Sequence, residues 1–168
     1  WLRIRSGKDG ELAMAMIHVL IEENVFDADF TRAWTNGPFL VRSDNHQLLT
    51  ELDLIAGGDS GTHYVADEGS GKLIPLRAQR SAGFPTREKN ADKNVLVPLE
   101  PKTHHAALFG TYEVKLADGK TVTCRSTLEV LKEAATQFAP EQSEQITTVP
   151  AAKVRKAVRL FAEEKPSS

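Results

Sequence analysis

The hydrophobic and polar positions divide the chain into two patterned ends and a polar middle. Residues 1–5 alternate apolar and basic side chains, which predicts a short strand. From Asp9 to Asn24 the apolar residues cover more than one helical face, so the pattern predicts a helix buried between layers. A second short helix is expected from Asp27 to Trp34, with Asp27 as its N-cap. The chain is therefore expected to open as strand, turn and helix.

The last third of the chain has an equally regular pattern. Alternation on both sides of Asp118-Gly119 predicts a β-hairpin, because Asp-Gly tolerates the positive φ of a tight turn. Ser126 and Glu129 have the spacing of a capping box and are expected to open a helix. Two further helices are expected to begin at prolines. The last of them is predicted to point Ala151, Val154, Val158 and Phe161 inward, and Lys153, Arg155, Lys156 and Arg159 outward.

The segment from about residue 57 to residue 105 differs from both ends. Gly, Pro, Ser and charged residues dominate it, and only residues 63–66 and 72–76 have strand-like composition. Residues 77–94 have low apolar content and no period. These properties predict a long irregular excursion on the surface.

Composition narrows the classes of function. One domain is the usual expectation for 168 residues, and a net charge of −2 gives no field of one sign that would attract nucleic acid. The longest apolar run, Leu12 to Ile21, is too short to cross a membrane. The single cysteine, Cys124, excludes an all-cysteine metal or iron–sulfur site within this chain, and strand alternation predicts that it is buried. Because the chain begins at Trp1 without a leader, we expect a piece of a longer protein.

Candidate chemistry lies in the turn Ser6-Gly7-Lys8-Asp9, just before the first long helix. Gly7 permits a left-handed or close-approach backbone, and the helix amino end presents free N–H groups with a partial positive charge. Lys8 could approach a phosphate or a carbonyl, and Asp9 could accept two N–H donors from a guanine edge. The alternative is structural: Ser6 and Asp9 have capping-box-like spacing, and an acid there stabilises a helix by roughly 0.3–1 kcal/mol without any ligand. Spacing alone favours this alternative.

Other motifs are assigned to ordinary structure. The segment Gly58-Asp-Ser-Gly61 resembles a serine-protease nucleophile loop, but a chain with a buried opening helix and no disulfide predicts a polar turn instead. His104 and His105 are adjacent, so in an extended segment they would point in opposite directions. His18 lies within an apolar helix, where a satisfied core histidine is expected. Neither a metal ligand nor a catalytic residue is therefore predicted.

Both ends of the chain resemble one known family. The opening Trp-Leu-Arg-Ile-Arg-Ser-Gly-Lys-Asp is similar to the segment Trp-Leu-x-Ile-Arg-Pro-Gly-Thr-Asp of the dimethyl sulfoxide reductase family of molybdopterin oxidoreductases. In that family an Ala/Leu/Met-rich helix follows, as it does here. The resemblance continues, in the right order, through residues 11–23, 26–30, 34–41, 138–146 and 149–162. It implies that the chain is an internal fragment of the large catalytic subunit.

The resemblance implies a fold and a cofactor. The fold would be α/β, a single partial domain over residues 1–168: Rossmann-like, with helices on a mostly parallel sheet, a local hairpin and the irregular excursion. In such enzymes the matched turn holds the guanosine end of one of two pterin guanine dinucleotides that ligate molybdenum or tungsten. Gly7, Lys8 and Asp9 would then contact the cofactor, with Asp9 on the guanine base. The family usually has Pro in place of Ser6 and Thr in place of Lys8, so the hydroxyl contact is not reproduced.

The resemblance also implies what lies elsewhere. The family's iron–sulfur cysteines, metal ligand and second pterin-binding region fall outside the matched segment, so the isolated chain is expected to be inactive and to expose apolar surface. The expected partners are the remaining domains of the same polypeptide and an iron–sulfur electron-transfer subunit. The substrate and the compartment, bacterial periplasm or cytoplasm, stay open. Two other functions stay open as well: a stand-alone guanine-nucleotide-binding module, and a structural or interaction fragment without a ligand.

Overall fold

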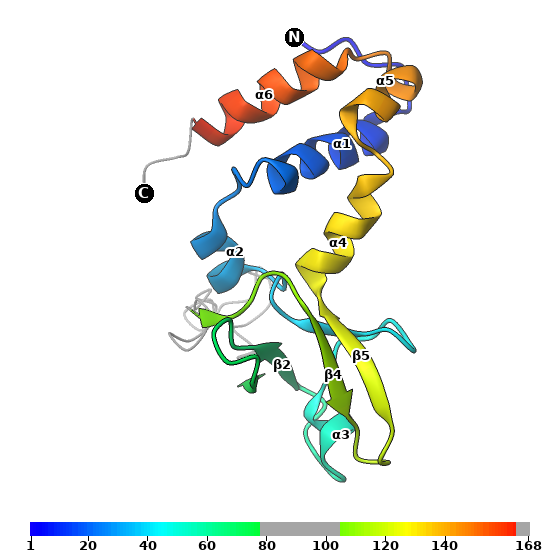
Figure 1. The fold of residues 1–168 in the computed structure, drawn as a ribbon. Coiled ribbons are helices and arrows are strands. Elements are labelled where there is room, and N and C mark those ends of the chain that lie inside the picture. The colour runs from blue at the N-terminus through cyan, green and yellow to red at the C-terminus, as the bar shows by residue number, and fades with distance from the viewer. Residues whose placement is uncertain (78–104, 164–168) are drawn as a thin grey trace, which may run out of the picture. The chain divides into compact units, whose positions relative to one another are not determined.

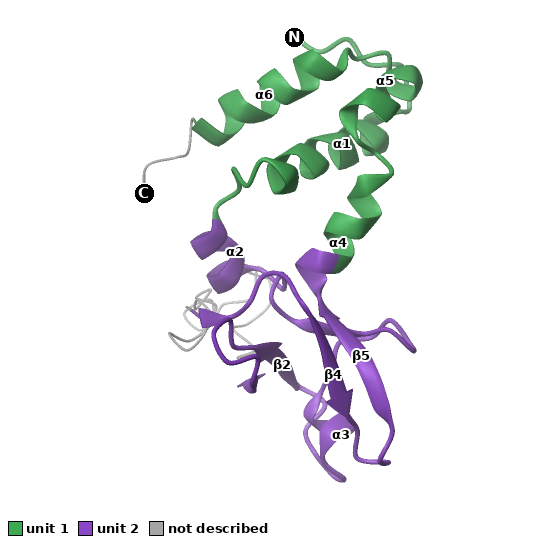
Figure 2. Cartoon of the chain, in the orientation of Figure 1, with its two compact units in different colours: residues 1–27, 130–168 green, residues 28–129 purple. Residues whose placement is uncertain are grey.

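A computed structural model describes residues 1–77 and 105–163, which group into two compact units (Figures 1 and 2). Unit 1 comprises residues 1–27 and the described residues from Val130 onward, and unit 2 comprises residues 28–129 apart from the undescribed stretch. Each unit has a hydrophobic core of its own. That the chain forms a single partial domain stays a prediction.

Unit 1 is built from helices. Helices α1 (Asp9–Glu22), α5 (Pro140–Thr147) and α6 (Ala151–Glu163) pack pairwise against one another, and the unit boundary falls within α4 (Thr127–Thr136). The structure confirms the predicted first helix to within two residues at its end, and confirms that Pro140 lies in the first turn of α5. The core of the unit contains Ala15, Val149 and Val154, with Leu2, Ile4, Leu12 and Met16 packed against them.

Arg155 of α6 joins the three helices through carboxylates. Its guanidinium donates to Glu141 of α5 at 3.0 and 3.2 Å, to Glu22 of α1 at 2.8 Å, and to Glu23 just after α1 at 3.2 Å. Arg159 adds two hydrogen bonds to Glu23, at 2.7 and 2.9 Å. Hydrogen bonds from these arginines lower the pKa of Glu23 and of Glu141 below the usual range. The network links α1 to α6 across more than a hundred residues of sequence.

Two expectations for unit 1 need correction. Residues 1–5 were expected to form a strand, but no described strand pairs with them, and Arg5 instead donates its N–H to the carbonyl of Thr147 at 2.9 Å. Phe161 was expected to face inward, but its side chain is 70% exposed, whereas Val154 and Val158 are buried as predicted. Periodicity identifies the face of a helix, but not how far neighbouring elements extend along that face.

Unit 2 contains two antiparallel sheets. A three-stranded sheet has the order β1-β5-β4, and a two-stranded sheet pairs β2 with β3. Two short helices, α2 and α3, precede β1 and β2 respectively. The bounds of these elements are α2 (Ala28–Trp34), β1 (Leu40–Arg42), α3 (Glu51–Leu54), β2 (Thr62–Ala66), β3 (Leu73–Arg77), β4 (Thr111–Lys115) and β5 (Thr121–Ser126).

The predicted hairpin is confirmed, but the predicted parallel sheet is not found in the described residues. Val114 pairs with Val122 across β4 and β5, and Gly119 in the turn has a φ of +86°. Every described strand pair is antiparallel. Parallel neighbours need a crossover of about a dozen or more residues, whereas residues 67–72 and 116–120 are short links. A Rossmann-like sheet stays a prediction.

Ser126 ends β5 and starts α4. Its buried Oγ accepts a hydrogen bond from the N–H of Glu129 at 3.2 Å and donates one to the carbonyl of Leu108 at 2.7 Å. The serine half of the predicted capping box is therefore confirmed.

In the excursion, the two strand-like pieces form β2 and β3, while the rest of it, residues 78–104, lies outside the described residues.

Apolar surface is exposed in both units, as expected for a piece that lacks neighbours. Helix α1 was expected to be buried between layers, yet only Ala15 and Val19 of α1 are fully buried within the described structure. The large apolar side chains that are about half exposed or more are Trp1, Phe30, Trp34, Leu52, Ile55, Leu160 and Phe161.

The thiol of Cys124 is predicted to be unreactive in the folded chain. The side chain is fully buried in β5, and burial raises the pKa of the thiol to about 11. At pH 8 only about one thiol in a thousand would be ionised, and the thiolate is the reactive form. Ellman's reagent should therefore react slowly with the native chain and quickly in concentrated urea. Equal rates in the two conditions would contradict the burial.

The Arg155 network is predicted to stabilise unit 1 above pH 5 and to fail in acid. A carboxylate whose pKa is lowered on folding contributes stability above its unfolded pKa and loses it as the pH falls through the folded pKa. Arg155→Met should lower the melting temperature at pH 7 and reduce the loss on acidification from pH 5 to pH 3. The matched control is Lys156→Met, an exposed cation of the same helix. Similar melting curves for the two variants at every pH would count against the network.

Candidate functional site

Backbone hydrogen bonds hold the turn that precedes α1. The N–H of Lys8 donates to the carbonyl of Arg5 at 3.2 Å, and Arg5 itself is tied to Thr147. Gly7 has a φ of +75°, in the left-handed region that favours glycine, as the sequence predicted. A Cβ at Gly7 or at Gly10 would meet no atom within 4 Å. The turn therefore offers bare backbone to open space at both glycines.

The predicted cap is absent from the start of α1. Lys8 occupies the N-cap position and makes no side-chain cap hydrogen bond. The side chains of Ser6 and Asp9 are exposed and form no hydrogen bond or ion pair with any other described residue. The capping-box interpretation of their spacing is therefore not supported, and the carboxylate of Asp9 is free at a helix end that favours negative charge.

Lys8 differs from Asp9 because its side chain already has a partner. Its Nζ forms an ion pair with Glu11 Oε1 at 2.7 Å, and this hydrogen bond lowers the pKa of Glu11. A contact between Lys8 and a phosphate would require this partly buried pair to open. This ion pair was not predicted, although the i,i+3 spacing of Lys8 and Glu11 indicates that the two side chains can meet.

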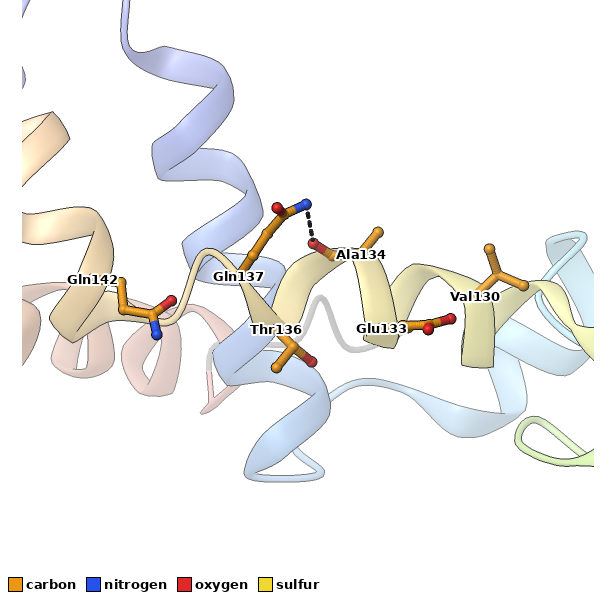
Figure 3. Close-up of a pocket in the computed structure, with 6 residues that line it drawn as sticks. All are labelled: Val130, Glu133, Ala134, Thr136, Gln137 and Gln142. Atoms are coloured by element: carbon orange, nitrogen blue, oxygen red, sulfur yellow. Dashed lines mark hydrogen bonds between the residues drawn. The ribbon is translucent and has the colours of Figure 1, made fainter.

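A separate hollow on α4 and α5 offers no comparable chemistry. It has a volume of about 680 Å³. Figure 3 shows Gln137, just after α4, turned back toward that helix, with its Nε2 donating to the carbonyl of Ala134 at 3.3 Å. Glu133 is the one ionisable residue among those that line it, so no acid–base pair converges there. The lining residues are Val130, Glu133, Ala134, Thr136, Gln137 and Gln142.

The remaining motifs lie where ordinary structure would place them. Asp59 accepts hydrogen bonds from the N–H of Gly61 at 3.0 Å and from Thr62 Oγ1 at 3.1 Å, so the Gly58–Gly61 segment is the predicted polar turn. His18 lies 3.5 Å from Glu22, His105 is exposed, and residue 104 is not described. In the described part of the chain, no three His, Cys, Asp or Glu side chains gather to hold a metal ion. No described helix has both the length and the hydropathy to span a membrane.

Curated relatives of the chain are subunits of oxidoreductases. It is 32% identical over 180 residues to perchlorate reductase subunit alpha of Dechloromonas aromatica (strain RCB), covering 99% of the chain and 19% of that protein. It is 33% identical over 165 residues to dimethylsulfide dehydrogenase subunit alpha of Rhodovulum sulfidophilum, covering 98% and 16%. Chlorate reductase subunit alpha of Ideonella dechloratans is 33% identical over 160 residues, covering 95% and 16%. No protein-family model matches the chain.

These relatives are catalytic subunits of oxidoreductases, and the chain is similar to one segment of each. The chain belongs to the dimethyl sulfoxide reductase family of molybdopterin oxidoreductases, which confirms the resemblance at its two ends. It spans 16% to 19% of the length of the three relatives named above.

Substitution of the two glycines is predicted to have opposite effects on stability. Gly7→Ala would force a side chain into the left-handed region and should destabilise the chain by about 1–2 kcal/mol. Gly10→Ala, in the first turn of α1 with open space around it, should stabilise the chain by about 0.5–1 kcal/mol. Urea denaturation of both variants measures the difference. A stabilising Gly7→Ala would show that the turn does not require its left-handed residue.

Proposed function

We propose that this chain is the guanosine-binding segment of an oxidoreductase that uses a molybdenum or tungsten pterin guanine dinucleotide. Membership of the family supports the kind of enzyme. The observation that carries the binding role is the free carboxylate of Asp9, exposed beside the bare backbone of Gly7. A hydrogen-bonded cap would have used that carboxylate within the chain.

The turn suits a guanine base because of its donors and acceptors. Guanine carries two neighbouring N–H donors on one edge, N1–H and the N2 amino group, and the two oxygens of Asp9 can accept both. Adenine lacks this pair of donors, so the same carboxylate would discriminate between the bases. Gly7 has no side chain to block a ligand, and Lys8 would reach a phosphate after releasing Glu11.

The cofactor, when bound, supplies the redox chemistry, and the residues of this chain bind and orient its nucleotide end. No catalytic role is proposed for Gly7, Lys8 or Asp9. The relatives are named for perchlorate, chlorate and dimethylsulfide, which includes both reductases and a dehydrogenase. We therefore propose oxidoreduction as the class of reaction and assign no substrate. The remaining parts of the same polypeptide and an iron–sulfur subunit are the proposed partners.

Two alternatives use the same turn differently. A stand-alone guanine-nucleotide-binding module would need the Asp9 contact but no redox partner. A structural fragment would need neither, and the uncapped start of α1 argues against it. A measurement of nucleotide binding distinguishes these functions, because the structural fragment would bind no nucleotide and the other two would bind a guanine nucleotide.

Guanosine diphosphate is predicted to bind the 168-residue chain more tightly than inosine or adenosine diphosphate. Inosine lacks the N2 amino group, and adenosine lacks both donors. Asp9→Asn should weaken the binding of guanosine diphosphate by about tenfold or more, since a bidentate contact to a base edge is worth roughly 1–3 kcal/mol. Calorimetric titration measures each dissociation constant.

Asp29→Asn provides the control for the Asp9 variant, because Asp29 is an exposed acid in the first turn of α2. Its substitution should leave the dissociation constants of all three nucleotides unchanged. Binding of guanosine diphosphate that survives Asp9→Asn would refute the guanine contact. A loss of thermal stability in Asp9→Asn, without any nucleotide binding by the native chain, would favour the structural fragment.

A further inference from the structure

A basic pocket lies in unit 1 on the side of residues 3–5. We use this name for the hollow of about 520 Å³ that is bordered by Arg3, Arg5 and Lys153 together with the connection between α5 and α6. The connection contributes residues 148–150. These residues come from the two ends of the chain, which the hydrogen bond from Arg5 to Thr147 joins.

The sequence pattern explains why the cations gather there. Leu2 and Ile4 pack against the hydrophobic core of unit 1, so the alternate residues Arg3 and Arg5 are left exposed. Thr148 has a φ of +64°, and this left-handed residue ends α5 and turns the chain toward α6. Lys153 then lies in the first turn of α6, beside the same hollow.

The three cations have no counter-charge. None of the residues that border the basic pocket is acidic, and Arg3, Arg5 and Lys153 make no side-chain hydrogen bond or ion pair with any described residue. The neighbouring acid Glu144 lies outside the lining and accepts the N–H of Ala151 at 3.0 Å. Arg155, only two residues beyond Lys153, is paired with three carboxylates. Unit 1 therefore pairs Arg155 with carboxylates and leaves the three cations of the basic pocket without an acidic partner in the described residues.

We propose that the basic pocket binds a phosphate-bearing ligand, with a diphosphate as the group that matches its three positive charges. Guanidinium groups donate in a planar fork that matches phosphate oxygens, and the lysine adds a point charge. At the start of α6 the N–H of Ala151 already donates to Glu144, so the three cations are the groups that would bind the ligand. The side chains of Arg3, Arg5 and Lys153 would bind the ligand and have no structural role, since they contact no other charged or polar side chain in the described residues.

Inorganic diphosphate is the probe that tests the pocket directly. Titrated into the 168-residue chain at low ionic strength, it should bind, raise the melting temperature and shift the backbone amide resonances of Ile4 and Thr148. The double variant Arg3→Gln/Lys153→Gln should weaken binding by at least tenfold. Lys156→Gln removes the same charge from an exposed position of the same helix and should change binding less than twofold. Added salt should weaken binding to the native chain.

Three results would overturn the proposal. These are no saturable diphosphate binding by the native chain, equal weakening by the double variant and by Lys156→Gln, and tighter binding of glutarate than of diphosphate. The last result would identify the basic pocket as a site for carboxylates, such as those of a protein segment. Because Gln preserves most of the side chain, each variant can be checked for unchanged melting without ligand.

The source of the phosphate is a separate question that the same chain can answer. If the ligand is the diphosphate of a guanine dinucleotide, guanosine diphosphate should bind more tightly than guanosine, and the double variant should remove that advantage. If the source is a free phosphate or diphosphate, guanosine and diphosphate should bind independently and simultaneously. Asp9→Asn should leave diphosphate binding intact in both cases. Failure of the guanine contact is thus distinguishable from failure of the basic pocket.

Discussion

The Arg155 network is the interaction on which the arrangement of unit 1 depends. One guanidinium in α6 binds carboxylates from α5 and from the end of α1, although α1 and α6 are separated by most of the chain. Packing around Ala15, Val149 and Val154 supplies the apolar contact between the same elements. The network therefore fixes the helices whose ends carry the turn and the basic pocket.

The turn shows how one spacing can have two explanations. Ser6 and Asp9 have the separation of a capping box, and the sequence could not distinguish a cap from a ligand contact. The structure lacks the hydrogen bonds of a cap, because the N-cap residue is Lys8 and the carboxylate of Asp9 has no partner in the described residues, and the ligand contact stays a proposal. A helix end without a side-chain cap retains free N–H groups. Those groups and Asp9 offer both donors and acceptors to a ligand.

Local signals in the sequence predicted local structure well, and partner-dependent features poorly. The helix from Asp9 and the Asp118-Gly119 hairpin depend on nearby residues, and both are confirmed. A parallel sheet depends on strands from elsewhere, so alternation over residues 1–5 could not establish it. The exposure of Phe161 and the pairing of Lys8 with Glu11 depend on what surrounds each side chain. The left-handed backbone of Gly7 was predictable because glycine favours that geometry, whereas the roles of Gly7, Lys8 and Asp9 come from the resemblance and stay a prediction.

Charged residues of unit 1 fall into two groups with different physical consequences. Arg155 and Arg159 form ion pairs with carboxylates at hydrogen-bond distance, and these pairs link the helices. No acidic partner in the described residues contacts the second group, Arg3, Arg5 and Lys153. Like charges around one hollow repel one another in the folded chain. Such repulsion opposes folding unless an anion offsets it. An unpaired basic group on a well-paired scaffold is therefore better explained by binding than by stability, and one of its members, Arg5, directly precedes the turn.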